Sequence, residues 1–216
     1  MATIEIVQTK LSEAKQRLEA MERKLQEREA VERVRAHLLK ARVSSAALKL
    51  ASADYYSWKL AERAQFLGCQ VPQLCKSIVM ENTACTNDGI ADPRNSRYYC
   101  VILQYNSKMN SEQLMRYVRT LLPENERPGR KAYNFQHAPG EVSDKLTGFL
   151  HNGVSPFGMK TAIPVLISSA VAQLNPPFIW LGGGAENVKL RIGVAQLIDA
   201  LNARVVDDLT TLRDDL

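Results

Sequence analysis

The residues best suited to chemistry lie in the segment 147–167, TGFLHNGVSPFGMKTAIPVLI. Gly148, Gly153 and Gly158 allow backbone angles with positive φ, and Pro156 fixes one φ and removes an amide. The segment therefore predicts a stiff loop whose remaining N–H groups face a ligand. Fixed amide dipoles suit a carbonyl oxygen that gains negative charge when an ester is attacked, although an ordinary tight surface turn has the same composition.

A lysine inside an apolar strand is the second chemical feature. Lys76 interrupts the segment LCKSIVM at residues 74–80. Placing an ammonium there is costly unless it finds a partner or reaches a cleft. Two placements stay open from the residues alone: an edge position turned to water, or a cleft in which the ammonium binds a ligand.

Three segments share the order and spacing of one known family. They are LCKSIVM with its lysine, the T-G-F and G-V-S-P-F-G motifs of the loop, and FIWLGGGAENVKLRI at 178–192. Together they resemble the YbaK family, which includes free-standing aminoacyl-tRNA deacylases and the editing domain associated with prolyl-tRNA synthetase. The resemblance implies an α+β core with a mixed, strongly curved sheet. Strands and helices that alternate without a βαβ rhythm indicate the same class.

The same resemblance implies the roles of individual residues. Lys76 and Gly153 are expected in catalysis: the lysine anchors the substrate end of an aminoacyl-tRNA, and the loop amides stabilise the tetrahedral intermediate. The residues expected to bind substrate are Gly148, Phe149, Asn152, Val154, Ser155, Pro156, Gly182, Gly183 and Gly184.

Two positions depart from the family pattern. Asn152 stands where most members have glycine, and asparagine also tolerates left-handed geometry, but its amide narrows the pocket or adds a donor. Lys189 stands where some members have an aspartate. Both predict a different substrate or a changed contact network. His151 has no catalytic counterpart and stays unassigned, whereas Tyr55 and Tyr56 either stack on a terminal adenosine or belong to the core.

Apolar periodicity and turn residues predict the elements that position these groups. We expect strands at 74–80, 98–105, 163–167, 178–184 and 188–192, and helices at 60–67, 111–122 and 194–202. Gly68 should end the first of these helices and Pro123 the second.

The N-terminal segment has a different pattern. Apolar residues recur at alternating spacings of three and four from Ile4 to Leu25, as in the heptad seam of a coiled coil. The register breaks between Leu25 and Val31, where the helix bends or passes its apolar face to a different partner. We therefore divide the chain into a helical extension with its join, 1–53, and an editing-domain unit, 54–216. Deletion of residues 1–42 is expected to leave the unit folded.

Composition narrows the classes of partner. The formal net charge of +5 suits a polyanion such as tRNA. The four cysteines and three histidines lack zinc-site spacing, and no segment of about 18 apolar residues occurs. We expect reduced thiols, no metal, no organic cofactor, no membrane partner and a cytoplasmic location. The expected partners are aminoacyl-tRNA and, through the N-terminal helix, either a synthetase or a second copy.

Two hypotheses of function follow from these features. The first is an enzyme that hydrolyses the ester bond of mischarged aminoacyl-tRNA in trans, with tRNA for proline as the first candidate. The second is a non-catalytic module that keeps the fold and binds tRNA or a synthetase. Asn152 and Lys189 favour the second, and release of amino acid by substoichiometric protein would decide for the first.

Overall fold

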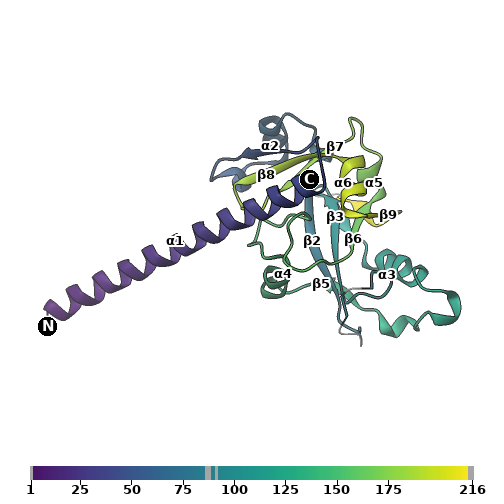
Figure 1. Cartoon of the computed structure of the whole chain (residues 1–216), viewed down its shortest axis with the longest axis horizontal. Helices are drawn as coiled ribbons and strands as arrows, with labels where there is room; N and C mark the ends of the chain where they lie inside the picture. Colours follow the sequence, from purple (N-terminus) through teal and green to yellow (C-terminus); the bar gives the residue numbers. More distant parts are fainter. Residues whose placement is uncertain (1, 86–88, 91, 214–216) are drawn as a thin grey trace.

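One long helix projects from a body of strands and short helices in the computed structural model of the chain (Figure 1). The structure describes residues 2–85, 89–90 and 92–213. The helices are α1 (Ala2–Lys40), α2 (Leu60–Leu67), α3 (Ser111–Thr120), α4 (Gly140–Thr147), α5 (Ser169–Ala172) and α6 (Val194–Leu201). Gly68 ends α2 in the left-handed conformation, and the Asn110 side chain caps α3 by accepting a hydrogen bond from the Gln113 amide, 3.1 Å away.

The strands form a mixed sheet, an antiparallel sheet and a small pair. They are β1 (Ala47–Leu50), β2 (Cys75–Asn82), β3 (Tyr98–Gln104), β4 (Ser107–Met109), β5 (Phe135–His137), β6 (Val165–Ser168), β7 (Phe178–Gly182), β8 (Val188–Gly193), β9 (Arg204–Val206) and β10 (Thr210–Leu212). The five-stranded sheet has the order β5-β2-β3-β6-β9, the three-stranded sheet β1-β8-β7, and β10 pairs with β4. β6 is parallel to β3 and β9, while β2 is antiparallel to β3 and β5. The predicted α+β class with a mixed sheet is confirmed.

All the strands and helices that the sequence predicted are present, with ends displaced by a few residues. The short strands β4, β5, β9 and β10 were not predicted, because three residues carry too little periodicity to be recognised. β1 lies in the segment that the sequence assigned to the join. It pairs with β8 from Ala47 opposite Arg191 to Leu50 opposite Val188, and so forms an edge of the three-stranded sheet.

The two faces of the five-stranded sheet bury different clusters. Side chains alternate along a strand, so neighbouring residues of β2 serve opposite faces. Cys75 and Val79 pack into a core with α1, α6 and the three-stranded sheet. Met80 belongs to a second core, which α3 covers with Leu114, Met115 and Val118.

α1 belongs partly to the body. Ala30, Val34 and Leu38 are only 2%, 0% and 6% exposed, and they share a core with Phe149 and Phe157. These positions lie just beyond the break in the heptad register. The helix continues without interruption to Lys40, so the break marks a change of partner rather than a bend.

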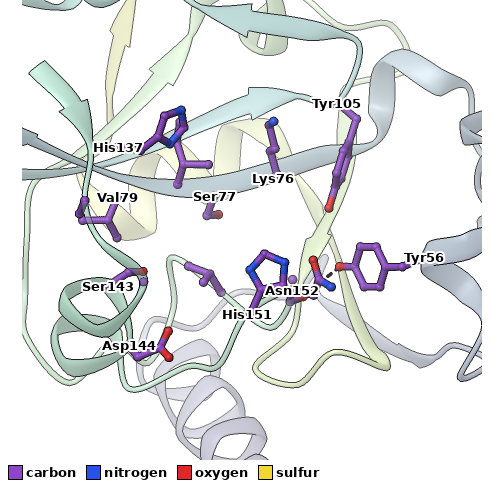
Figure 2. A pocket seen from close by; sticks show the side chains of 15 residues that line it. Tyr56, Lys76, Ser77, Val79, Tyr105, His137, Ser143, Asp144, His151 and Asn152 are labelled. Carbon is purple, nitrogen blue, oxygen red and sulfur yellow. Dashed lines mark hydrogen bonds between the residues drawn. The ribbon is translucent and has the colours of Figure 1, made fainter.

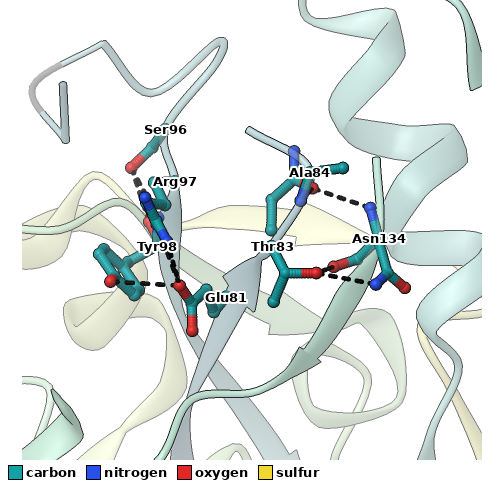
Figure 3. A network of polar contacts seen from close by, with 8 residues as sticks. Glu81, Thr83, Ala84, Ser96, Arg97, Tyr98 and Asn134 are labelled. Atoms are coloured by element: carbon teal, nitrogen blue, oxygen red, sulfur yellow. Dashed lines mark hydrogen bonds and ion pairs between the residues drawn. The ribbon is translucent and has the colours of Figure 1, made fainter. Parts of the chain in front are cut away.

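A buried ion pair closes the far end of β2 and β3 (Figure 3). The Arg97 guanidinium donates to the Glu81 carboxylate at 2.8 and 3.0 Å, and the Tyr98 hydroxyl donates to the same oxygen at 3.3 Å. Next to it, the Thr83 amide donates to the Asn134 carbonyl at 3.0 Å. These contacts link the neighbouring ends of β2 and β3 and the segment before β5.

Candidate active site

A cavity of about 510 Å³ opens where the two larger sheets diverge. Leu74 bridges Trp180 of β7, and beyond this bridge β2 and β7 separate. β5 pairs with β2 only from Met80 to Asn82, which leaves the edge of β2 before it open to the cavity. The volume lies within the range of small-molecule and cofactor sites. The lining residues are Tyr56, Lys76, Ser77, Ile78, Val79, Tyr105, His137, Ala138, Gly140, Ser143, Asp144, His151, Asn152, Val154 and Gly182.

Lys76 and Ser77 extend from opposite faces of β2. Figure 2 shows the Ser77 side chain directed toward the loop that carries His151 and Asn152, and the Lys76 ammonium directed away from that loop. The ammonium lies 5.8 Å from the centre of the Tyr105 ring and forms no ion pair with any described residue. Burial, with a smaller contribution from Arg213, lowers the pKa of Lys76. Lys76 thus offers an uncompensated donor at the wall of the cavity.

Ser77 is a candidate that the sequence reasoning missed. Its side chain is 7% exposed, and its hydroxyl has no hydrogen-bond partner in the described part of the chain. A buried polar atom without a partner loses free energy unless a ligand or water satisfies it. Because a serine after a lysine in a strand carries no signal of its own, only the direction of the side chain reveals it.

The loop turns at Asn152, whose φ of 64° lies in the left-handed region. This confirms the geometry that the sequence suggested for this residue. The Gly153 amide donates to the Leu150 carbonyl at 3.0 Å, so it is engaged within the turn itself. The backbone amides of Asn152 and Val154 make no hydrogen bond to described residues, and both residues line the cavity. These two amides, rather than that of Gly153, can face a ligand.

The glycines near the loop are required by close approach of the backbone. A Cβ at Gly153 would lie 3.1 Å from the Gly184 carbonyl oxygen, and a Cβ at Gly182 would overlap the Val154 carbonyl. Contacts this short are not seen for real Cβ atoms or force their neighbours to move. The glycines at the end of β7 and the loop glycine therefore fit against one another, which brings the loop to the edge of the cavity.

A polar network fixes the loop from the side of the three-stranded sheet. The Tyr56 hydroxyl donates to the Asn152 carbonyl at 2.9 Å and accepts a hydrogen bond from the Lys189 ammonium at 2.8 Å. The side-chain amide of Asn152 donates to a Glu186 carboxylate oxygen at 2.9 Å. The other Glu186 oxygen lies 3.7 Å from the Arg23 guanidinium of α1. Asn152 is thus connected to β8 and to the N-terminal helix.

Lys189 is buried, with 3% of its surface exposed. Desolvation lowers its pKa to about 7, against a smaller opposing effect of Glu186. Its ammonium lies 4.1 and 4.7 Å from the ring centres of Tyr56 and Tyr55 and donates to the Glu186 carbonyl at 2.7 Å. Burial also raises the pKa of Tyr56, which keeps its hydroxyl protonated as a donor. The sequence prediction of a different substrate or a changed contact network at Lys189 stays a prediction.

The base of the loop is held by α1. The Arg33 guanidinium donates to the carbonyls of Gly148 and Gly158, and the Gly158 amide donates to Nδ1 of His37 at 2.9 Å. Burial, followed by the charge of Lys40, lowers the pKa of His37, which favours the neutral ring that this contact needs. The helix that the sequence treated as an extension therefore contacts the loop directly.

The structure brings only part of the expected site to the cavity. Lys76, Asn152, Val154 and Gly182 line it. The others lie behind it: Gly148 ends α4 with a φ of 71°, Phe149 and Ser155 are fully buried, Pro156 is buried, and Gly183 and Gly184 pack on Val188 and Ala30. These six residues support the loop in this structure, and so does Gly153, which does not line the cavity and whose amide is engaged within the turn. Tyr105, Asp144 and His151 reach the cavity without having been assigned a role. Tyr56, for which stacking and core packing were left open, also lines it.

Two kinds of site are absent from the described residues. No group of three or more histidine, cysteine, aspartate or glutamate side chains is arranged to bind a metal ion there. Within the same part of the chain, no helix combines the length and apolar character needed to cross a bilayer.

Comparison with known proteins identifies the family and the fold. The family model of the aminoacyl-tRNA editing domain matches residues 58–200. A crystal structure of a "putative trans-editing enzyme for prolyl tRNA synthetase" is similar with a TM-score of 0.63 and 21% identity, over 82% of this chain and 95% of that one. A hypothetical protein is similar with a TM-score of 0.63 and 17% identity, over 83% and 99%.

A third similar structure comes from work on computational grafting of epitopes onto scaffold proteins. It has a TM-score of 0.62 and 19% identity, over 87% of this chain and 98% of that one. At these identities the structures show a shared fold. No curated protein matches the chain.

Proposed function

The chain belongs to the aminoacyl-tRNA editing domain family, and from this premise we propose that it hydrolyses the ester bond of mischarged aminoacyl-tRNA in trans. The first candidate substrate is a mischarged tRNA for proline, because one similar structure is described as a trans-editing enzyme for prolyl tRNA synthetase. We also propose a cytoplasmic location, where translation consumes aminoacyl-tRNA.

The observation that carries this proposal is the pair of unengaged amides at Asn152 and Val154, on the rim of a cavity that also exposes Lys76. In the proposed reaction, the oxygen of water attacks the ester carbonyl carbon, the two amides stabilise the resulting oxyanion, and the bond to the tRNA hydroxyl breaks. The proton lost by water is taken up by the leaving oxygen. Loss of one such donor typically slows a reaction by about a hundred- to a thousand-fold.

Lys76 is proposed to bind the tRNA end of the substrate rather than the reacting carbonyl. Its ammonium points away from the loop and lies beside Tyr105, so phosphate or ribose oxygens at that side of the cavity would be its partners. Ser77 points toward the loop and is proposed to bond to the aminoacyl group. In this proposal Lys76 binds the tRNA end of the substrate and Ser77 binds its aminoacyl end.

The test is release of amino acid from a panel of mischarged tRNAs by substoichiometric protein. We expect multiple turnovers, with Lys76→Ala weakening substrate binding and Ser77→Ala lowering kcat/KM by about tenfold, the value of one hydrogen bond. Lys145→Ala is the matched control, because Lys145 is exposed on α4 outside the cavity. Full turnover by Lys76→Ala would remove Lys76 from the site.

A non-catalytic tRNA- or synthetase-binding module is the second candidate. It is favoured by the network of Tyr56, Lys189 and Glu186, which ties the carbonyl and side chain of Asn152 to the protein at the place where most relatives have a glycine. In that case the protein would bind the tRNA panel in a filter assay and release no amino acid from any member of it.

A further inference from the structure

A stripe of apolar side chains on the projecting half of α1 has no partner in the structure. Ile4, Val7, Leu11, Leu18, Met21 and Leu25 are 55% to 68% exposed, and Ala14 completes the spacing of three and four. We call these seven residues the seam. It covers about 33 Å of helix at 1.5 Å per residue. Of the large exposed apolar residues here, only Ile6 lies off it.

The seam and the body occupy opposite sides of the same helix. The positions that contact the body are Arg23, Ala30, Arg33, Val34, His37 and Leu38. At about 100° per residue, their mean direction is roughly opposite to that of the seam. Beyond Leu25 the seam positions become Arg28, Glu32 and Arg35, all exposed. The apolar stripe therefore ends where the helix docks, and a partner helix could run along it without meeting the body.

We propose that the seam packs against the seam of a second copy of this chain, in a parallel two-stranded coiled coil. In this register Ile4, Leu11, Leu18 and Leu25 occupy position a, and Val7, Ala14 and Met21 occupy position d. Apolar residues at a and d bury each other as knobs in holes. This proposal does not depend on the catalytic activity, since the surface lies away from the cavity.

The charges that flank the seam favour a copy of the same chain in the parallel direction. Positions e and g of a coiled coil set the partner and its orientation, and in a parallel pair each g residue faces the e residue five positions further on. Arg17 then faces Glu22, and Lys24 faces Glu29, each pair being formed twice by symmetry. In the same arrangement Lys10 faces Lys15, which is a repulsive pair, but the two attractive pairs outnumber it.

An antiparallel pair would place the g edges against each other. That edge consists of Lys10, Arg17 and Lys24, so it would bring only positive charges together. In the parallel arrangement the bodies lie on the outer sides of the two helices, because they dock at positions opposite the seam. Charge and geometry therefore select the same arrangement.

Sedimentation equilibrium of the full chain tests the proposal. We expect a dimer that dissociates on dilution, and a monomer for the double variant Leu11→Glu with Leu18→Glu. The matched control is Thr9→Glu with Gln16→Glu, which adds the same charges at the same spacing on the outer face and should remain dimeric. Near-ultraviolet circular dichroism would show that the body of each variant is folded.

A cysteine substituted for Met21 tests whether the two helices are parallel or antiparallel. In a parallel pair Met21 faces Met21 of the other copy, whereas an antiparallel pair that overlaps the whole seam separates them by about 20 Å along the helix axis. Met21→Cys should therefore form a covalent dimer under mild oxidation, while the unmodified chain does not. A monomeric unmodified chain, a larger oligomer, or a dimer that survives the Leu11 and Leu18 substitutions would overturn the proposal. Failure of the Met21 link would overturn the parallel arrangement.

Discussion

Asn152 connects the loop to two other parts of the protein. Its carbonyl accepts a hydrogen bond from Tyr56, its side chain donates to Glu186, and its backbone has a left-handed φ of 64°. Glycine reaches this φ without steric cost, so a glycine at this position would keep the turn. What asparagine adds is the side-chain bond and a narrower rim to the cavity that Asn152 lines.

Asn152→Gly should therefore change selectivity more than stability. We expect the free energy of unfolding to change by no more than about 1 kcal/mol, since the backbone is unstrained and one partly exposed hydrogen bond is lost. Pocket discrimination by one small group is worth about 1 to 3 kcal/mol. The measurement is the ratio of deacylation rates for alanyl-, cysteinyl-, seryl- and threonyl-tRNA.

Asn152→Ala is the control for backbone geometry. It also removes the side-chain amide, but its Cβ disfavours the left-handed region, so it should be less stable than the glycine variant. Unchanged rate ratios in the glycine variant would mean that selectivity is set elsewhere in the cavity.

Lys189 should make stability depend on pH. Its pKa is about 7 in the folded protein and near the ordinary 10.5 when unfolded, so between these values the unfolded chain binds more protons. The free energy of unfolding should therefore rise as pH increases from about 7 toward 10. Below pH 7 the ammonium is present in both states, and the penalty for burying it is complete.

Lys189→Met should remove this dependence. The variant keeps a long side chain without the charge, so its gain over the unmodified protein should be largest near pH 6 and shrink as pH rises. Urea unfolding at a series of pH values measures the difference. If the free energy of unfolding had the same pH dependence in both proteins, that dependence would come from other groups and not from Lys189.

At the scale of elements, α1 serves two purposes along its length. Its first part, through Leu25, exposes the seam, and its last part buries Ala30, Val34 and Leu38 in the core. Within that last part, Arg33 and His37 hold the base of the loop. We therefore propose that the folded unit begins within α1, near Ala30, rather than at the predicted boundary after residue 53.

Two truncations separate these purposes. Removal of residues 1–22 should leave the body as stable as before, because the side chains of residues 4–22 are exposed. Removal of 1–42 takes away three buried apolar side chains, of which Val and Leu contribute about 1.5 to 3 kcal/mol each. Against a total of about 5 to 15 kcal/mol, we expect a protein that is largely unfolded or aggregated.

Circular dichroism and thermal melting of the two truncated proteins measure this. If the protein 43–216 had the same melting temperature as the full chain, the folded unit would begin after α1, as the predicted boundary after residue 53 implies. The 1–22 deletion also controls for the loss of the seam, since it removes six of the seven seam residues and the 1–42 deletion removes all of them.

At the scale of the whole molecule, the cavity exists because two sheets diverge around one bridge between Leu74 and Trp180. The chain as a whole carries a formal charge of +5, which favours a polyanion. We expect the apparent affinity for aminoacyl-tRNA to fall steeply with salt concentration, because each phosphate contact releases counterions. Measuring KM at several salt concentrations tests this.

An aminoacylated adenosine is the control substrate. It has the ester and the terminal base but lacks most of the phosphates, so its KM should change little with salt. Equal salt dependence of both substrates would show that the effect acts on the protein rather than on tRNA binding.

The sequence by itself determined the elements whose signals are local. Gly68 ends α2, and apolar alternation marks β2, β3, β7 and β8. It also determined the family, since motifs at 74–80, 147–167 and 178–192 are read in order along the chain. The left-handed backbone angle of Asn152 could also be predicted, because few residues other than glycine and asparagine tolerate such a φ.

Only the tertiary structure decided which groups meet. Ser77, which had carried no signal, faces the loop, because the register of β2 directs alternate side chains to opposite faces. The Gly153 amide is engaged inside its own turn, a hydrogen bond that composition cannot show. The partners of Lys189 and Arg33 are distant in sequence, so packing alone places Lys189 against Tyr56 and α1 against the loop.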